Sequence, residues 1–310
     1  MSPTKRWSFI INPIAGNGSA ANYLDKINAI ISEYKLEAKI LFTERKGHAI
    51  DITKNLLLQG YNHIIAVGGD GTFNEVAQNL LGKDDIIFGA VPAGTGNDFI
   101  AILGFPERFT DSDWHIFLNQ ATMKMDVGTC NDKFFFNGMG LGFDAQVAAE
   151  NYKNAHKQEV KKGGKSKYLW HILKTLITYQ EINMKLTVDR TSTDSKSFLN
   201  TISNGRRIAG GLFLTPQALA NDGRLDVCLI RELKFFSRLK ELIHVMKKTH
   251  LEDEVVNYFQ TDRLLFEFEK EVPAHLDGEL YFNSRFEIGI RASALNVIYN
   301  PEGDHYFISK

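Results

Sequence analysis

Cysteine and long apolar runs are both nearly absent from this sequence. The only cysteines, Cys130 and Cys228, form no CxxC pair and no disulfide ladder, so a reducing compartment is expected. No apolar run approaches the roughly 18–20 residues that a membrane-spanning helix needs. The polar start of the chain, Met1 to Trp7, lacks the apolar region of a secretory signal. Together these absences predict a cytoplasmic protein.

An excess of charge of either sign is absent as well. The chain carries 36 basic and 37 acidic side chains, which leaves a formal net charge of −1. Domains that bind nucleic acid are normally strongly basic, so no nucleic-acid partner is expected. With 44% hydrophobic and 24% charged residues the composition is that of a globular protein. At roughly 150 residues per domain, the 310 residues predict about two domains.

The first third of the chain alternates short apolar runs with amphipathic stretches. The apolar runs predict strands at 7–12, 38–43, 63–67 and 86–91. The stretches between them predict helices at 21–34, 48–59 and 73–81. Strands separated by helices of this length form βαβ units, so we expect an α/β domain with a parallel sheet.

Beyond residue 124 the pattern changes to short alternating strands. They are predicted at 184–189, 197–203, 225–230, 264–268 and 286–290, with helices near 168–179 and 235–248. This pattern favours a mainly antiparallel β-sandwich. The expected organisation is an α/β domain over 1–127, a β-rich domain over 128–300, and a tail over 301–310 that packs back on the first domain.

A glycine-rich motif follows the third predicted strand, with the sequence GGDGTFNEV at 68–76. Glycines allow the backbone to turn tightly and to bring its N–H groups against an anion, and a helix N-terminus favours phosphate. The alternative is a tight turn in which Asp70 only caps a helix. Three glycines in four residues favour phosphate binding.

Two more glycine loops follow predicted strands, PAGTGNDF at 92–99 and NPIAGNG at 12–18. The carboxyl ends of neighbouring parallel strands lie at one edge of a sheet, where open α/β folds bind ligands. Gly16, Gly18 and Ala21 formally match a dinucleotide fingerprint, but Asn12 and Pro13 separate them from the strand. This loop therefore indicates phosphate binding more than NAD binding.

Two acidic elements lie in the second half, NDG at 221–223 and DGE at 277–279. Asp-Gly next to a strand is often only a turn. Two carboxylates two residues apart can also point to one side of an extended segment and supply a base or a metal ligand. For NDG the residues alone favour the turn, and for DGE they leave both alternatives open.

Six lysines and a single glutamate, Glu159, lie in the segment 153–167. A solvated charged segment explains such a run, and so does attraction to an anionic membrane surface at about 1 kcal/mol per lysine. The sequence does not choose between them.

In order and spacing, the motifs resemble those of the diacylglycerol kinase catalytic-domain family, which includes bacterial lipid kinases and sphingosine kinases. The resemblance continues through MDVG at 125–128, FNGMGLGFDA at 136–145, GGLFLTPQALANDGRLDV at 210–227 and LDGE at 276–279. It implies an N-terminal three-layer α/β domain like that of NAD kinases, followed by a β-sandwich, with an active-site cleft enclosed by the two and Asp126 near it.

The resemblance also implies roles for individual residues. Mg²⁺ would be held by Asp222 with the backbone at Leu219 and Arg224, and Glu279 or Asp277 would be the general base. Asp70 would lie near a second magnesium on the nucleotide phosphates and share in catalysis. The residues expected to bind ATP are Asn12, Pro13, Ile14, Ala15, Gly16, Thr43, Gly68, Gly69, Asp70, Gly71, Thr72, Phe73, Asn74 and Thr95.

The expected activity is therefore that of an ATP- and Mg²⁺-dependent kinase that phosphorylates the hydroxyl group of a membrane lipid, with diacylglycerol as the first choice. An NAD kinase-like activity and a non-catalytic nucleotide or lipid sensor are the alternatives. The expected partners are a membrane lipid as substrate and an anionic membrane surface to which the protein binds peripherally. The sequence leaves open whether the chain forms a homodimer.

Overall fold

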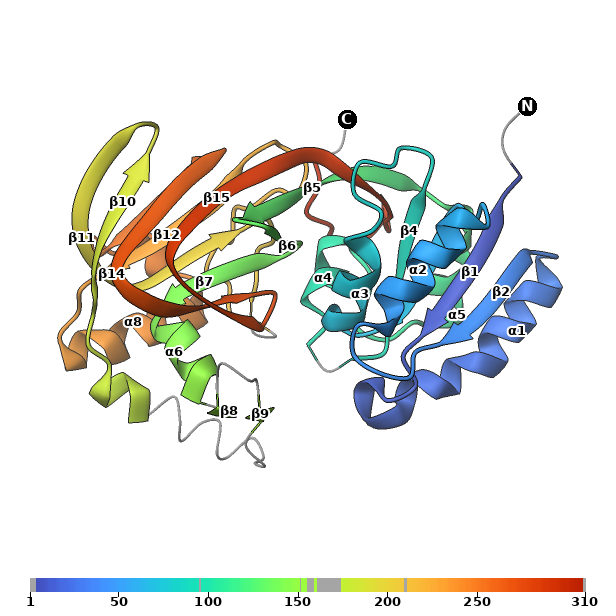
Figure 1. Cartoon of the computed structure of the whole chain (residues 1–310), viewed down its shortest axis with the longest axis horizontal. Helices are drawn as coiled ribbons and strands as arrows, with labels where there is room; N and C mark the ends of the chain where they lie inside the picture. The colour runs from blue at the N-terminus through green and yellow to red at the C-terminus, as the bar shows by residue number, and fades with distance from the viewer. Residues whose placement is uncertain are drawn as a thin grey trace. The chain divides into compact units, whose positions relative to one another are not determined.

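A computed structural model gives the structure of the chain, shown in Figure 1. It describes residues 4–94, 96–150, 152–154, 159–160, 174–208 and 211–308. The chain divides into two compact units. Unit 1 consists of Met1–Val127, Ala220–Asp222 and Ala292–Lys310, and unit 2 of Gly128–Leu219 and Gly223–Arg291.

Unit 1 is built on a parallel sheet. Its strands are β1 (Arg6–Ile11), β2 (Glu37–Phe42), β3 (His63–Gly68), β4 (Ile87–Pro92) and the end of β15 (Glu279–Ile298). Their order is β15-β4-β3-β1-β2, and all pair in parallel. Every residue of β3 is buried, which explains its continuous apolar sequence, because a parallel sheet is covered on both faces.

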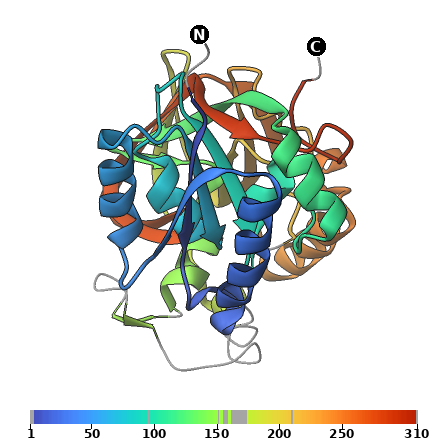
Figure 2. The same ribbon diagram turned by 90° about the vertical axis from the view of Figure 1, so that its right-hand side faces the viewer.

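Helices cover both faces of this sheet, as Figure 2 shows for unit 1. On one side lie α2 (His48–Leu58) and α3 (Asp70–Ala77), and on the other α1 (Tyr23–Glu33) and α5 (Asp111–Asn119). The remaining helices of unit 1 are the short η1 (Ala15–Asn22) and α4 (Asp98–Ile102). The predicted three-layer α/β fold is confirmed.

Unit 2 is a mainly antiparallel β structure, as predicted. Its strands in sheet order are β13 (Val256–Thr261), β12 (Leu225–Arg231), β11 (Thr191–Ser203), β10 (Asn183–Val188), β14 (Arg263–Leu276) and β15. A further strand, β7 (Gly138–Gly142), pairs with both β11 and β14. The strand β5 (Thr122–Cys130) begins in unit 1 and ends in unit 2. Unit 2 also has the short strands β6 (Lys133–Phe135), β8 (Tyr152–Asn154) and β9 (Glu159–Val160).

Two apolar clusters form the interior of unit 2. One lies among the strands around Phe135, Phe266 and Phe286, all fully buried. The other includes Phe143 and Val245 and lies under α6 (Phe143–Glu150) and α8 (Phe235–Lys247). The short helix η2 (His250–Glu252) follows α8 in the chain. Each cluster gives its part of the unit an apolar core of its own.

Both cysteines are free and buried, and burial raises the pKa of each thiol to about 12. Such thiols are unreactive, as expected of cysteines that only pack. Within the described residues, no helix is both long enough and apolar enough to cross a membrane. Of the helix expected near 168–179, residues 168–173 lie outside the described residues, and residues 174–178 are helical.

Candidate active site

The three glycine loops of unit 1 come together at the carboxyl ends of β1, β3 and β4. A Cβ atom added to Gly94 would lie 2.6 Å from the Cα of Gly69, so two main chains touch where no side chain fits. Gly16 has a φ of +57°, and a Cβ there would overlap the carbonyl oxygen of Ala93. The glycines are therefore needed for the close approach of the three loops.

Side chains fasten these loops to one another. The Asn12 amide donates to the Thr72 hydroxyl at 3.0 Å, which joins the first loop to the second. The Ser19 hydroxyl donates to the carbonyl oxygen of Ala93 at 3.3 Å, and the Tyr23 hydroxyl to that of Pro92 at 3.0 Å. These bonds hold the loop after β1 against the loop after β4.

Asp70 also ties two loops together. It is the first residue of α3, but its carboxylate accepts hydrogen bonds from the backbone N–H groups at the start of α4, Asp98 at 3.3 Å and Phe99 at 3.1 Å. The sequence left open that Asp70 caps a helix. In the structure its carboxylate accepts from N–H groups at the N-terminus of α4, not from those of its own helix α3. A carboxylate there also interacts favourably with the helix dipole.

The other residues expected to bind ATP differ in exposure. Ile14 is 80% exposed, whereas Thr43, Thr72 and Phe73 are buried. The Thr43 N–H donates to the carbonyl oxygen of Ile11 at 2.9 Å, which continues the pairing of β2 with β1. Thr95 lies outside the described residues. The edge therefore offers glycine backbone and helix N-termini, the groups that bind phosphate.

In unit 2 the DGE element forms the turn between β14 and β15. The Asp277 carboxylate accepts three backbone N–H bonds, from Phe136 at 2.7 Å and from Asn137 and Gly138 at 3.0 Å each. Asp277 itself has a φ of +46°, in the left-handed region that tight hairpin turns use. Glu279, the first residue of β15, is exposed.

A histidine–carboxylate pair, which the sequence reasoning did not find, lies close to this turn. The His275 Nε2 atom is 3.0 Å from an Asp144 oxygen. Burial alone would lower the pKa of His275, but the hydrogen bond and charge of Asp144 raise it above its ordinary value. A Cβ on Gly140 would overlap the pair, so this position must be glycine. Asp144 lies in the motif GFDA at 142–145 and His275 in HLDGE at 275–279, so both partners belong to motifs that the sequence shows.

The expected magnesium ligands Leu219, Asp222 and Arg224 lie within six residues that lead into β12. Gly223 there has a φ of +77°, which turns the chain. The Asn221 side chain bonds both backbone groups of Ile308, the carbonyl at 3.3 Å and the N–H at 2.7 Å. The donors that these positions offer, one carboxylate and two carbonyls, are oxygens and thus fit a hard cation.

Asp126 is completely buried within unit 1. Its carboxylate accepts from the Ser293 N–H at 2.6 Å, and its own N–H donates to the carbonyl oxygen of Ala220 at 2.8 Å. It therefore joins three separate parts of the sequence that make up this unit.

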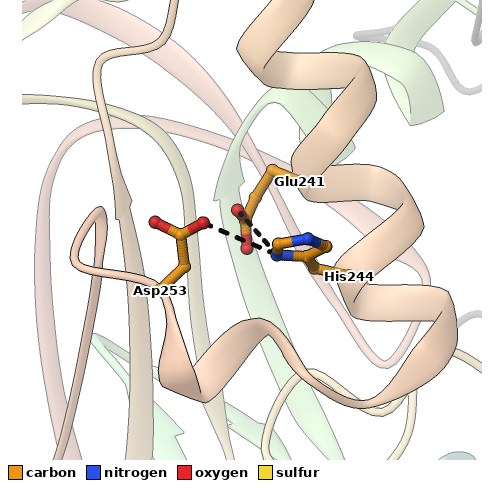
Figure 3. Close-up of side chains that lie close together, drawn as sticks. All are labelled: Glu241, His244 and Asp253. Atoms are coloured by element: carbon orange, nitrogen blue, oxygen red, sulfur yellow. Dashed lines mark ion pairs between the residues drawn. The ribbon is translucent and has the colours of Figure 1, made fainter.

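The described residues contain one further titratable cluster, shown in Figure 3. The His244 Nδ1 atom lies 3.5 Å from an Asp253 oxygen and 3.9 Å from a Glu241 oxygen. Burial raises the pKa of Glu241, whereas the hydrogen bond from Lys240, at 2.8 Å, lowers that of Asp253. Because Lys240 supplies the cation for Asp253, the cluster is explained as an ion-pair network that fastens α8 to the turn after it.

Comparisons with known proteins agree with this architecture. Residues 6–130 match the model of the diacylglycerol kinase catalytic domain, and residues 137–299 match that of the YegS C-terminal NAD kinase beta sandwich-like domain. A probable lipid kinase YegS-like protein of Chromohalobacter salexigens is 29% identical, over 93% of this chain and 92% of its own. A diacylglycerol kinase of Bacillus subtilis is 24% identical, over 89% of this chain and 90% of its own.

A crystal structure of a diacylglycerol kinase from Bacillus anthracis has the same fold. Its TM-score is 0.74 at 21% identity, over 96% of this chain and 97% of that one. Fold and matches together define an enzyme of the lipid kinase class. The chain belongs to the family in which a diacylglycerol kinase catalytic domain precedes a YegS-type C-terminal NAD kinase beta sandwich-like domain.

Proposed function

We propose that this lipid kinase transfers the γ-phosphate of ATP to the hydroxyl group of diacylglycerol, giving phosphatidic acid, in a Mg²⁺-dependent reaction. The observation that carries the proposal is the meeting of three glycine loops at one edge of the sheet in unit 1, where Gly69 and Gly94 touch main chain to main chain. The choice of diacylglycerol rests on the Bacillus subtilis relative, which is named a diacylglycerol kinase.

In this proposal the loops bind the nucleotide. Residues 12–16 and 68–74, with Thr43 and Thr95, hold ATP and its phosphates, and the donors are backbone N–H groups of the glycine loops. Asp70 keeps the start of α4 against the second loop through its two hydrogen bonds, so that the donors are already oriented before ATP arrives. Pre-oriented donors are the main contribution of a protein to phosphoryl transfer.

Leu219, Asp222 and Arg224 would hold Mg²⁺, the first and last through their backbone carbonyls. A bound Mg²⁺ would supply positive charge beside the Asp222 carboxylate and fix the backbone that ligates it. The oxygen-only donor set supports this assignment.

Glu279 is the proposed general base. It accepts the proton of the lipid hydroxyl as that oxygen bonds to the γ-phosphorus, while the bond from phosphorus to the bridging oxygen breaks and ADP leaves. Three backbone N–H groups occupy the Asp277 carboxylate, so Asp277 positions the turn, whereas the exposed Glu279 can meet a substrate.

A transfer assay with γ-labelled ATP tests this function. Diacylglycerol, sphingosine, phosphatidylglycerol and NAD are offered separately, each with Mg²⁺ and with a chelator, and Glu279→Gln serves as the matched inactive control. We expect labelled phosphatidic acid only with Mg²⁺ and wild-type enzyme. Label in NAD would favour an NAD kinase-like activity, and ATP binding without transfer to any acceptor would favour a sensor.

A further inference from the structure

The helix α8 of unit 2 is amphipathic, but it buries charged side chains and exposes its apolar ones. Its buried residues are Arg238, Glu241 and Val245, two of them charged. A surface helix ordinarily buries its apolar stripe and exposes its charges. Arg238 supports the inversion, because its guanidinium has hydrogen-bond partners within the protein.

Arg238 is the main attachment of the inner face. Its guanidinium donates to the carbonyl oxygens of Leu233 and Leu176 at 3.0 and 2.8 Å, and to Glu181 at 2.7 Å. The side chains of Arg238 and Glu181 are only 8% and 6% exposed. Together with the bond from Lys240 to Asp253 at 2.8 Å, these contacts hold α8 on the unit.

The outer face of α8 is apolar. Phe236, Leu239, Ile243 and Met246 follow one another at helical spacing, and Phe236 and Met246 are 82% and 67% exposed. Phe235 extends this row at the start of the helix and is also exposed. A contiguous row of large exposed apolar side chains is uncommon on a monomer and indicates a contact with another molecule or a membrane.

Positive charge borders this row. Between 234 and 248 the sequence has five basic residues and one acid, and the buried Arg238 and Glu241 account for one of each. The exposed charges that remain are all lysines, at 234, 240, 247 and 248, of which Lys240 is paired with Asp253. Apolar side chains with lysines beside them match the acyl chains and anionic headgroups of a lipid surface, and the lysine stems can extend along the apolar row.

We propose that the α8 face, defined as Phe235, Phe236, Leu239, Ile243 and Met246 with the lysines beside them, docks the protein on an anionic membrane. The proposal rests on the proposed function, because that function requires the enzyme to reach a lipid substrate. It concerns residues other than those of the lysine-rich segment 153–167, whose side chains lie outside the described residues. A second copy of the chain is the rival occupant.

Sedimentation with vesicles of phosphatidylglycerol and phosphatidylcholine, without ATP or diacylglycerol, tests the docking surface. We expect Phe236→Ser with Met246→Ser to lower the partition coefficient about a hundredfold, because each of the two side chains would lose an apolar contact worth about tenfold. Lys247→Gln should lower it about fivefold, and added salt should weaken wild-type binding.

The matched control lies on α2 in unit 1, where Leu58 is 86% exposed and Lys54 is exposed. Leu58→Ser and Lys54→Gln should leave vesicle binding unchanged. Equal losses in the α2 and α8 variants would overturn the proposal. So would a wild-type dimer that becomes monomeric in Phe236→Ser/Met246→Ser while vesicle binding is unchanged, since a second copy would then occupy the face.

Kinase activity on a short-chain, water-dispersed diacylglycerol separates this inference from the proposed function. The α8 variants should keep that activity and lose it only on vesicles. An inactive wild-type enzyme whose vesicle binding still depends on α8 would contradict the proposed function and support the docking surface. An active enzyme whose vesicle binding ignores the α8 substitutions would contradict the docking surface alone.

Discussion

Asp70 of unit 1 and Asp277 of unit 2 occur in similar motifs, each beside a glycine at the end of a strand. The Asp70 carboxylate accepts two backbone N–H bonds at the start of α4, and that of Asp277 accepts three at the start of β7. In both places the aspartate fastens one segment to another. The motifs differ in what lies beside the aspartate, which is glycine backbone in unit 1 and the exposed Glu279 in unit 2. The aspartate of such a motif can thus be the residue that holds two segments together, and neighbouring residues of the motif can carry the chemistry.

The largest expected effect separates Glu279 from Asp277. Glu279→Gln should lower kcat by about 10²–10⁴, because a positioned base contributes about that factor. The KM for ATP and the thermal stability should stay the same, since an exposed side chain is replaced by one of nearly the same shape. Steady-state kinetics and calorimetry check this. Wild-type kcat in Glu279→Gln, with an inactive but equally stable Asp277→Asn, would assign the base to Asp277.

The second prediction compares the two anchors by stability. Asp277→Ala should lower the free energy of unfolding by at least about 3 kcal/mol, because three backbone N–H groups lose their acceptor at once. Asp70→Ala, which releases two N–H groups at a helix end, should cost about 1–2 kcal/mol. Hydrogen exchange should accelerate at the amides of Phe136, Asn137 and Gly138 in the first variant.

In the Asp70 variant the faster amides should instead be those of Asp98 and Phe99. A variant of Asp277 that unfolds and exchanges like wild type would show that water replaces the carboxylate, and the distinction between anchor and base would then fail. Asp70→Asn and Asp277→Asn are the milder controls, since each retains one acceptor oxygen.

The parallel sheet was the easiest part of the fold to predict. Strands β3 and β4 were placed within about two residues at each end, because a strand buried on both faces reads as one apolar run. The helix α5 was missed, although Thr110 and Asp113 form a capping box that marks its start. The prediction of β14 covered only its first half, since charged residues and a register shift between Glu267 and Val272 interrupt the alternation.

The glycine loops were also predictable, because glycine-rich turns after apolar strands have a physical meaning of their own. The partners of the two aspartates were not. Asp277 bonds residues about 140 positions earlier in the chain, and nothing local in the sequence indicates such a pair. The return of 220–222 and of 292–300 to unit 1 is equally non-local, and an association with the first domain was expected only for the tail beyond residue 300. Sequence patterns thus indicate which segments form turns and which are buried, and the fold decides which of these segments contact one another.

The smallest expected effect concerns pH and the His275–Asp144 pair beside the DGE turn. Burial would lower the pKa of His275, but Asp144, with a smaller contribution from Asp277, raises it above its ordinary value near 6.5. The folded protein therefore binds this proton more tightly than the unfolded chain does. The stabilisation is fully present below about pH 6.5 and is lost as the pH rises through the raised pKa.

Urea unfolding of wild type and Asp144→Asn between about pH 5.5 and 9 measures this dependence. The stability difference between the two proteins should be largest at the acidic end and should shrink as the pH rises, because neutral His275 no longer forms an ion pair. Glu37→Gln, which removes the exposed partner of Arg6 in unit 1, serves as control, since arginine and carboxylate both stay charged over this range. A difference for Asp144→Asn that is as flat as that of the control would show that His275 is neutral throughout, and the pair would then be a neutral hydrogen bond rather than an ion pair.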